Sequence, residues 1–278
     1  NLYRDTQRFT ESEQMFKLAL EIHKRLAESN PQAYEPDLAM FYNNLAILYL
    51  NIQRFTEGEQ MFMLALEIRK RLAESNPQAY EPDLAMSYNN LAYLYRDTQR
   101  FTESEHMYKS ALEIYKRLSE SNPHAYEPHL ATLNNNLGLL YHTTLRFAES
   151  EQMYKSALEI RKRLSESNPH AYVPLLAASY NTFANLYYDT QRFIESEQMY
   201  KSAMEIFKRL DASNPKVYEP ELAMSYNNLA NLYCNTQRFA ESEQMHKSAL
   251  EIRKRLIESN PQAYEPELAM SYINLGVL

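Results

Sequence analysis

Residues 82–127 read PDLAMSYNNLAYLYRDTQRFTESEHMYKSALEIYKRLSESNPHAYE, and closely similar copies of this stretch recur along the chain every 46 residues. Internal repeats of this kind are typical of solenoids, in which each copy is one structural unit. The phrase Asn-Pro-x-x-Tyr marks the period, with its proline at Pro31, Pro77, Pro123, Pro169, Pro215 and Pro261. A second proline follows five residues later in every copy, at Pro36, Pro82, Pro128, Pro174, Pro220 and Pro266.

The first half of the quoted unit predicts an amphipathic helix, called helix A, over about residues 83–98. Pro82 precedes it, and proline suits the first turn of a helix because its missing N–H is not needed there. Apolar residues then recur at spacings of three and four, which places their side chains on one face of a helix. These residues are Leu84, Tyr88, Leu91, Leu94 and Tyr95.

The second half predicts helix B, which runs from about Thr102 to Ser121 after a tight turn at residues 99–101. Thr102 with Glu105 matches the capping box, in which two side chains satisfy free N–H groups at a helix start. The same pair occurs as Thr10 with Glu13 and as Thr56 with Glu59. The following Asn-Pro dipeptide predicts the end of the helix, with at most a single helical turn after it.

A single hairpin of two such helices cannot bury both apolar stripes, whereas stacked hairpins can. The sequence therefore predicts an all-α fold, an α-solenoid of stacked antiparallel helix hairpins that forms one array over residues 1–278. The predicted array has a partial unit at 1–35, full units at 36–81, 82–127, 128–173, 174–219 and 220–265, and a partial unit at 266–278.

Composition narrows the range of functions. The net charge of −7 argues against nucleic-acid binding, which requires a basic surface. One cysteine excludes an internal disulfide and a multi-cysteine zinc site, and it fits a reducing, cytoplasmic location. No apolar run is long enough to span a membrane. The chain begins with Asn1 rather than methionine, from which we expect it to be cut from a longer protein.

The repeated residues resemble the tetratricopeptide signature. The match consists of Tyr88-Asn-Asn-Leu91-Ala92-x-x-Tyr95 followed by Phe101, Ser104, Tyr108 and Ala111. The Ala-Leu-Glu-Ile-Arg run at residues 65–69, 157–161 and 249–253 is similar to kinesin-light-chain-like repeats. The resemblance implies a right-handed superhelix whose concave groove, lined by helix A, binds a protein or an extended peptide.

The sequence also departs from the tetratricopeptide pattern. Gln99 replaces the usual glycine between the helices, and Lys116 replaces the proline that normally closes helix B, so helix B should run on for roughly two more turns. The 46-residue period is longer than the common tetratricopeptide period and longer than the kinesin-light-chain form.

No group of residues stands out as catalytic. His124, His129 and His170 lie near the predicted loops between units, without a cysteine partner, and we expect them to be solvated rather than metal ligands. Glutamates recur in every unit, for example at Glu103 and Glu105, which fits caps and solvated faces better than a singular catalytic carboxylate. Arg-Lys-Arg runs, found at residues 69–71, 161–163 and 253–255, are expected to complement the helix dipole. We predict no enzyme activity, no metal site and no cofactor.

The differences between copies indicate a binding surface on helix A. An almost constant asparagine occupies one position, at Asn43, Asn89, Asn135, Asn181 and Asn227. Variable residues follow four and seven positions later, a spacing that keeps them on the same face of the helix. The first variable position holds Asn1, Ile47, Tyr93, Leu139, Asn185, Asn231 and Val277, and the second holds Arg4, Leu50, Arg96, His142, Tyr188 and Cys234. The predicted peptide-binding residues are the five asparagines with Tyr93, Arg96, Leu139, His142, Asn185, Tyr188 and Asn231.

Two interpretations of this face remain open at the level of sequence. The amides can hydrogen-bond to the backbone of an extended peptide while the variable neighbours bind its side chains. Alternatively, the asparagines hold adjacent helices together and the variable residues drift because they are exposed. Variation also occurs on helix B, at His23, Arg69, Tyr115, Arg161, Phe207 and Arg253.

One copy differs from the others near residue 175. Val173 and Leu175 replace polar residues, and Phe183 replaces leucine nearby. Exposed apolar side chains on a loop can mark a contact surface, and local repacking around Phe183 explains them equally well.

The sequence thus predicts a protein- or peptide-binding scaffold that uses helix A. The alternatives are a sensor or regulatory segment of a larger signalling ATPase or protease, and an array that self-associates through its ends.

Overall fold

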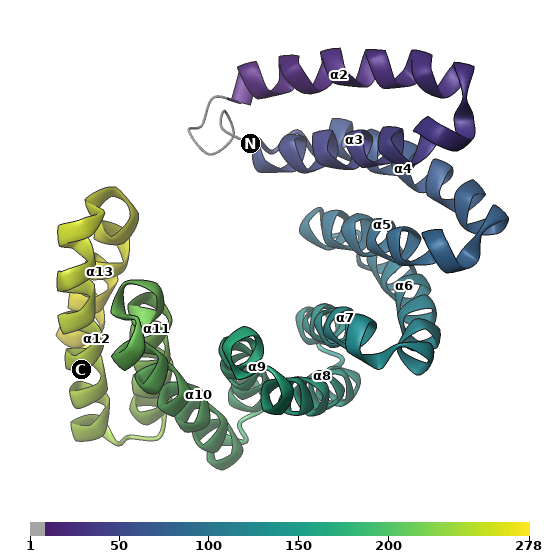
Figure 1. Ribbon diagram of the computed structural model, residues 1–278. Helices are drawn as coiled ribbons and strands as arrows, with labels where there is room; N and C mark the ends of the chain where they lie inside the picture. Colours follow the sequence, from purple (N-terminus) through teal and green to yellow (C-terminus); the bar gives the residue numbers. More distant parts are fainter. Residues whose placement is uncertain (1–8) are drawn as a thin grey trace. The chain divides into compact units, whose positions relative to one another are not determined.

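The computed structural model describes residues 9–278, and this part of the chain is all-α. It contains twelve helices, α2 to α13, which recur with the predicted period, as from Pro31 to Pro77 (Figure 1). The even-numbered helices correspond to helix B: α2 Phe9–Ser29, α4 Phe55–Ser75, α6 Phe101–Ser121, α8 Phe147–Ser167, α10 Phe193–Ser213 and α12 Phe239–Ser259. The odd-numbered helices correspond to helix A: α3 Pro31–Asn51, α5 Pro77–Asp97, α7 Pro123–Thr143, α9 Pro169–Asp189, α11 Pro215–Asn235 and α13 Pro261–Val277.

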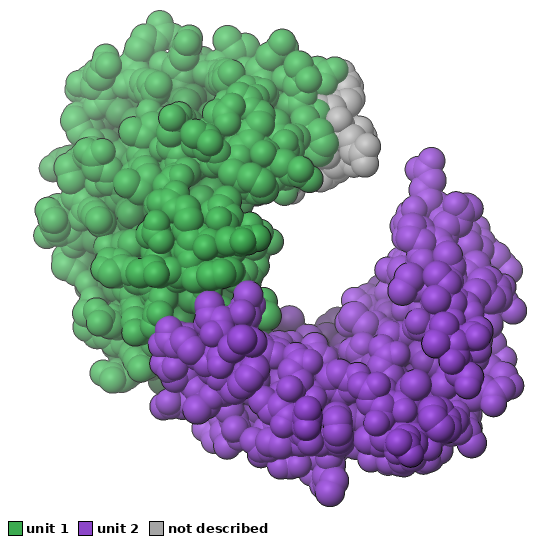
Figure 2. Space-filling view, turned by 180° about the vertical axis from the view of Figure 1, so that it is seen from behind, with its two compact units in different colours: residues 1–140 green, residues 141–278 purple. Residues whose placement is uncertain are grey.

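The helices group into two compact units, which Figure 2 shows in separate colours. Unit 1 comprises residues 1–140, and unit 2 comprises residues 141–278. Within each unit, consecutive helices pack in pairs, which confirms the predicted fold of stacked helix hairpins. The prediction of one array over the whole chain remains a prediction.

Each unit buries the apolar stripes of its own helices. In unit 1, Leu91 of α5 is buried together with Phe62 and Leu66 of α4. In unit 2, Phe183 of α9 is buried and stacks on Tyr187, with ring centroids 4.5 Å apart. Leucine stands at the position of Phe183 in the other copies, so this copy has repacked locally around a larger ring.

Helix A begins about six residues earlier than predicted, at Pro77 rather than near residue 83. The Asn-Pro dipeptide starts the helix as well as ending the previous one, because the Asn76 side chain accepts a hydrogen bond from the Ala79 N–H (3.3 Å) and Pro77 occupies the first turn. Pro82 lies inside α5, although the sequence analysis placed it at the helix start. The carbonyl that it leaves unbonded belongs to Gln78 in the exposed first turn, where water can bond to it.

The turn between helix A and helix B forms a Schellman motif. The Arg100 N–H bonds to the Tyr95 carbonyl (2.7 Å), and the Gln99 N–H bonds to the Arg96 carbonyl (3.0 Å). Gln99 adopts a positive φ of 59°, in the region where glycine is usual. The same conformation recurs at Gln53, Leu145, Gln191 and Gln237.

The predicted capping box at the start of helix B is wrong. The N-cap of α6 is Arg100, which makes no side-chain cap, so Thr102 already lies inside the helix. Arg100 instead pairs with Glu103 one turn along (3.0 Å). The Schellman turn fixes the entry to the helix, which explains why copies without the threonine start helix B at the same position.

A glutamate of helix B links consecutive hairpins, rather than capping its own helix as predicted. The Glu59 carboxylate accepts hydrogen bonds from the Tyr95 hydroxyl (2.9 Å) and from Arg100 Nη1 (2.8 Å). The Arg100 guanidinium also lies over the Tyr95 ring, 4.1 Å from its centroid. This Glu–Arg–Tyr cluster recurs as Glu13–Arg54–Tyr49, Glu151–Arg192–Tyr187 and Glu197–Arg238–Tyr233.

Candidate functional site

The helix A face, which we define as the predicted peptide-binding residues on the odd-numbered helices, contains both buried and exposed side chains. Tyr93 is 42% exposed, and Asn185 and Asn231 are also exposed. Asn43 and Asn181 are buried. The remaining members are half-buried: Asn89, Arg96, Asn135, Leu139, His142, Tyr188 and Asn227. Asn1 and Arg4, the first members of the two variable positions, lie outside the described residues.

Several of the constant asparagines hold neighbouring A helices together. Asn90 Nδ2 of α5 donates to Asn43 Oδ1 of α3 (2.8 Å). The same bond recurs from Asn136 to Asn89 (3.2 Å) and from Asn274 to Asn227 (2.9 Å). The second asparagine of each pair was not among the predicted site residues, although the repeated Asn-Asn dipeptide was a visible signal. These asparagines therefore hold adjacent helices together, as one of the two interpretations of the sequence had it. In each bond, Oδ1 of the constant residue is the acceptor.

This series of amide bonds is interrupted in one copy. Thr182 stands where the other copies have the donor asparagine, and its hydroxyl donates to the Ala178 carbonyl of its own helix (2.9 Å). Asn181 Nδ2 donates instead to the Ser225 hydroxyl (3.1 Å). Among the described residues, Asn135 Oδ1 and Asn181 Oδ1 are buried without a hydrogen-bond partner.

Contacts with neighbouring side chains hold several residues of the variable positions in place within each unit. In unit 1, Arg96 pairs with Asp97 (2.9 Å), and its guanidinium lies over the Tyr93 ring, 4.6 Å from the centroid. In unit 2, His142 Nε2 lies 2.8 Å from an Asp189 carboxylate oxygen. Two further contacts in unit 2 run from Asn235 Nδ2 to the Tyr188 hydroxyl and from the Tyr200 hydroxyl to Asn185 Oδ1. The helix A face is therefore preorganised, with side chains of different chemistry in successive copies.

A recess of about 270 Å³ opens between α3 and α5 of unit 1. Apolar side chains form much of its wall, with Ile47 and Leu50 from α3 and Phe62 from α4. Its other lining residues are Asn51, Phe55, Asn89, Asn90, Tyr93 and Asp97. Of the lining residues, Asn89 and Tyr93 belong to the predicted site, whereas Leu50 and Ile47 were noted only as variable.

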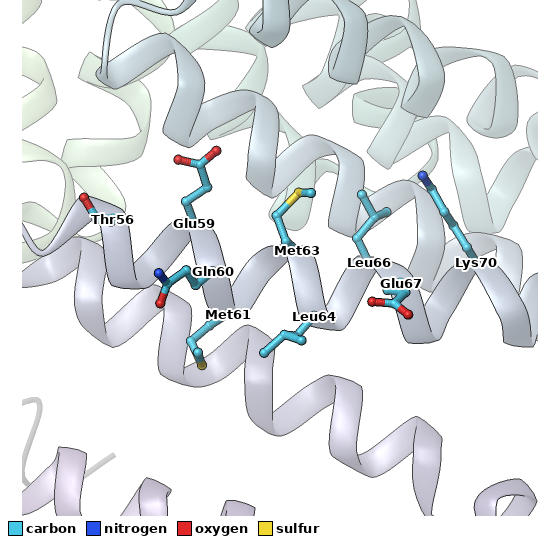
Figure 3. A pocket seen from close by; sticks show the side chains of 9 residues that line it. All are labelled: Thr56, Glu59, Gln60, Met61, Met63, Leu64, Leu66, Glu67 and Lys70. Carbon is cyan, nitrogen blue, oxygen red and sulfur yellow. The ribbon is translucent and has the colours of Figure 1, made fainter.

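A larger hollow of about 720 Å³ lies along α4, on the helix B side of unit 1. Figure 3 shows its side chains along this one helix, with Met61 and Leu64 on one side and Glu59, Met63 and Lys70 on the other. Met63 is 50% exposed and Leu64 is 38% exposed. The other copies have lysine and, except for Leu18, serine at these two positions, so this apolar surface is specific to one copy.

The Arg-Lys-Arg runs were expected to complement the helix dipole, but the structure buries the first arginine of each run. Arg69 is 3% exposed, and its Nη1 donates to the Ser87 hydroxyl (2.7 Å) of the next helix A. Burial lowers the pKa of the Arg69 guanidinium below its ordinary value. Arg161 and Arg253 make the equivalent bonds to Ser179 and Ser271. These arginines are packing residues and do not form a basic patch.

The apolar pair near residue 175 lies within helix α9, not on a loop as predicted. Val173 is partly buried and packs against the core of unit 2. Leu175 is 44% exposed, and its carbonyl accepts a hydrogen bond from Arg161 (3.2 Å). Val173 thus has a packing role, and a contact role for the pair remains a prediction.

The histidines also lie in helices rather than loops. His124 and His129 are in α7 and His170 is in α9, and all three are exposed. The His129 ring stacks on Tyr115, with centroids 5.3 Å apart. In the described part of the chain, no three histidine, cysteine or acidic side chains are grouped so that they could hold a metal ion. Over the same residues, no helix has the length and apolar character needed to cross a membrane.

Two sequence models of the tetratricopeptide repeat match the chain, one over residues 37–117 and 83–163 and the other over residues 1–32, 176–210 and 222–262. The chain belongs to the tetratricopeptide repeat family. No curated protein matches its sequence. Tetratricopeptide repeats generally mediate protein–protein interaction, so the family supports a binding function without specifying the binding face.

Solved structures share this tetratricopeptide fold. BtubC (BKLC) from P. vanneervenii superimposes with a TM-score of 0.72 at 24% identity, covering 89% of this chain and 92% of that one. Repeats assigned to a kinesin light chain of Podosopora anserina give a TM-score of 0.62 at 15% identity, covering 81% and 98%. A signal transduction ATPase from Pyrococcus horikoshii with a tetratricopeptide repeat sensor gives 0.67 at 17% identity, covering 94% of this chain but only 36% of that one. The predicted likeness to kinesin-light-chain-like repeats is confirmed at the level of fold.

Proposed function

We propose that this tetratricopeptide repeat protein is a non-enzymatic scaffold whose helix A faces bind an extended peptide segment of a partner protein. One observation carries the proposal. Hydrogen bonds between asparagines keep the A helices in register, while the side chains presented beside them change from copy to copy. A constant frame with variable surface residues suits recognition of a sequence that does not itself repeat.

In such a shallow site, the binding free energy is shared among many weak contacts. A typical hydrogen bond contributes about 0.5–1.5 kcal/mol net, whereas aromatic and aliphatic anchors dominate affinity at most interfaces. Tyr93, with 42% of its surface exposed, is the most accessible aromatic anchor of the predicted site. Leu139 and Tyr188 are half-buried and contribute less free surface.

Photo-crosslinking tests the location of binding. A peptide is first selected from a displayed library of random sequences against the chain, then added to four variants that each carry benzoylphenylalanine at one position. Positions 93 and 231 report on the helix A face of unit 1 and unit 2, and positions 63 and 251 report on helix B of the same units. We expect crosslinks at 93 or 231 only. Crosslinks confined to 63 or 251, or failure to enrich any peptide, would contradict the proposal.

A second candidate function is that of a sensor segment in a larger signalling protein. It rests on the fold shared with the tetratricopeptide repeat sensor of the Pyrococcus horikoshii ATPase. Self-association through array ends is a third proposal, which draws on exposed apolar residues of α2 and α13 such as Ile22 (49%) and Ile273 (56%). Light scattering over a range of concentrations distinguishes it, because a concentration-independent monomer would exclude self-association.

A further inference from the structure

At three positions in or beside the recess between α3 and α5, this copy has a less polar residue than most of the other copies. Leu50 stands where the other copies have Arg4, Arg96, His142, Tyr188 and Cys234. Phe62 stands where Tyr108, Tyr154, Tyr200 and His246 occur, with only Phe16 in common. Gly58 replaces a serine that is present in every other copy: Ser12, Ser104, Ser150, Ser196 and Ser242. Leu50 and Phe62 line the recess, and Gly58 lies directly behind Leu50.

Two of these changes depend on each other. A Cβ atom at residue 58 would lie 2.6 Å from Leu50 Cδ1, closer than two carbon atoms can approach. Leu50 can therefore keep its present position only because residue 58 is glycine. A side chain at 58 would push the leucine end elsewhere, so the pair together determines the shape of the recess.

The Leu50–Gly58 pair gains apolar packing, because Leu50 lies against the buried cluster around Phe62, but it loses a hydrogen bond. In other copies the serine hydroxyl donates to a carbonyl of helix A, as from Ser104 to Ala92 (2.7 Å) and from Ser196 to Ala184 (2.9 Å). Gly58 cannot make this bond, and glycine inside a helix is itself unfavourable. Local rules are most often broken in this way at functional sites.

Two polar residues of the recess wall offer one donor and one acceptor to a bound chain. Asn89 uses its Oδ1 to accept from Asn136, and Asn90 uses its Nδ2 to donate to Asn43. Among the described residues, nothing bonds to Asn89 Nδ2 or to Asn90 Oδ1, and both residues line the recess. An amide N–H and a C=O side by side match the two hydrogen-bonding groups of a peptide backbone.

The volume indicates what can enter. At about 270 Å³ the recess is smaller than the roughly 300–1,000 Å³ pockets that enclose a drug-sized ligand. An apolar wall with these two polar residues suits a single side chain whose own backbone stays at the opening.

We propose that this recess binds one large aliphatic or aromatic side chain, of leucine, methionine or phenylalanine, from an extended peptide whose backbone bonds to Asn89 and Asn90. The proposal rests on the peptide-binding function proposed above and adds the identity of an anchor residue to it. At the position of Leu50, helix A of the other copies has arginine, histidine, tyrosine or cysteine. The anchor side chain therefore enters between α3 and α5.

The test exchanges residues between copies of the chain. Leu50→Arg with Gly58→Ser installs the pair found at Arg96 and Ser104, so the variant is expected to fold, which thermal denaturation checks. Peptides selected against the unchanged chain should carry a leucine, methionine or phenylalanine whose replacement by alanine weakens binding. The double variant should bind them about ten- to hundred-fold more weakly, because burial of such a side chain is lost.

Two further variants complete the design. Ile47→Asn installs the residue found at Asn185 and Asn231, and it keeps the proposal testable if the double variant fails to fold. Met63→Lys with Leu64→Ser, which restores residues of other copies on the helix B side, should leave affinity unchanged.

The outcomes separate the two proposals. If selected peptides crosslink at position 93 or 231 but bind both recess variants as tightly as the unchanged chain, the anchor proposal fails and the peptide-binding function stands. If the selected peptides share no apolar anchor, the anchor proposal also fails. If no peptide is enriched at all, both fail together.

Discussion

At the scale of single residues, the turn between helix A and helix B carries a conformational cost in every described copy. Gln99 and its equivalents adopt φ near 60°, where a side chain crowds the backbone. The two hydrogen bonds of the Schellman motif hold this conformation in place. Glycine, which the tetratricopeptide pattern usually has here, would adopt it without strain.

Gln99→Gly should therefore raise the free energy of unfolding by up to about 1 kcal/mol, because relief of strain exceeds the entropy that glycine adds to the unfolded chain. Urea denaturation followed by circular dichroism measures the change. Gln99→Ala is the control, since alanine retains a Cβ and should show no such gain. A glycine variant less stable than the alanine variant would refute this account of the turn.

At the scale of helices, the contacts between hairpins explain what could and could not be predicted. The period of 46 residues and the apolar spacing predict the two helices of each copy. The start of helix A at Pro77 was missed because a second proline at Pro82 looked like a helix start. The roles of Glu59 and Arg69 were missed because their partners lie in the next hairpin, and local spacing gives no information on how hairpins stack.

The buried arginine of helix B and the serine of the next helix A should be energetically coupled. Ser87→Ala removes one acceptor of Arg69, whose Nη1 also donates to the Asp83 carbonyl (3.2 Å), and loss of a buried hydrogen bond to a charged donor costs about 1–3 kcal/mol. Arg69→Phe installs the residue found at Phe207, where the facing position is again serine, Ser225.

A double-mutant cycle measures the coupling. Ser87→Ala should lower the free energy of unfolding when residue 69 is arginine and hardly change it when residue 69 is phenylalanine. Chemical denaturation of the four proteins measures both differences. Equal costs in both backgrounds would show that the Arg69–Ser87 bond contributes nothing to the interface.

At the scale of the whole molecule, repetition makes the chain sensitive to acid. Burial opposes ionisation of Glu197, but hydrogen bonds from Arg238, Lys201 and Tyr233 outweigh it and lower the pKa of this carboxyl to about 2. Similar contacts also lower the pKa of Glu13 and of Glu151. A Glu–Arg–Tyr cluster thus stabilises consecutive hairpins within both units.

A lowered folded-state pKa stabilises the fold at pH values above the unfolded pKa, and this contribution is lost as the pH falls towards the folded pKa. The melting temperature should therefore decline between pH 4.5 and about 2, the range between the ordinary and folded pKa of Glu197. Each kcal/mol lost should lower it by roughly 2–4 °C. Glu197→Gln should melt at a lower temperature at neutral pH and lose less on acidification. An unchanged acid profile in this variant would exclude a contribution from the cluster.

The sequence could locate the helix A face but not divide its residues by role. Variation between copies identified Tyr93 and Asn231, which are exposed, while four of the five constant asparagines, all except Asn135, bond between helices. The central claim is that exposed, variable side chains bind the partner, while the hydrogen bonds between asparagines maintain the frame.

The most direct test records melting temperature and affinity for a selected peptide on the same preparation. Tyr93→Ala with Asn231→Ala removes one exposed side chain from the helix A face of each unit and should weaken binding about ten-fold or more at an unchanged melting temperature. Asn136→Ala, which removes the donor to Asn89, should instead lower stability by about 0.5–1.5 kcal/mol. Full affinity in the Tyr93→Ala, Asn231→Ala variant, with its fold intact, would contradict the claim.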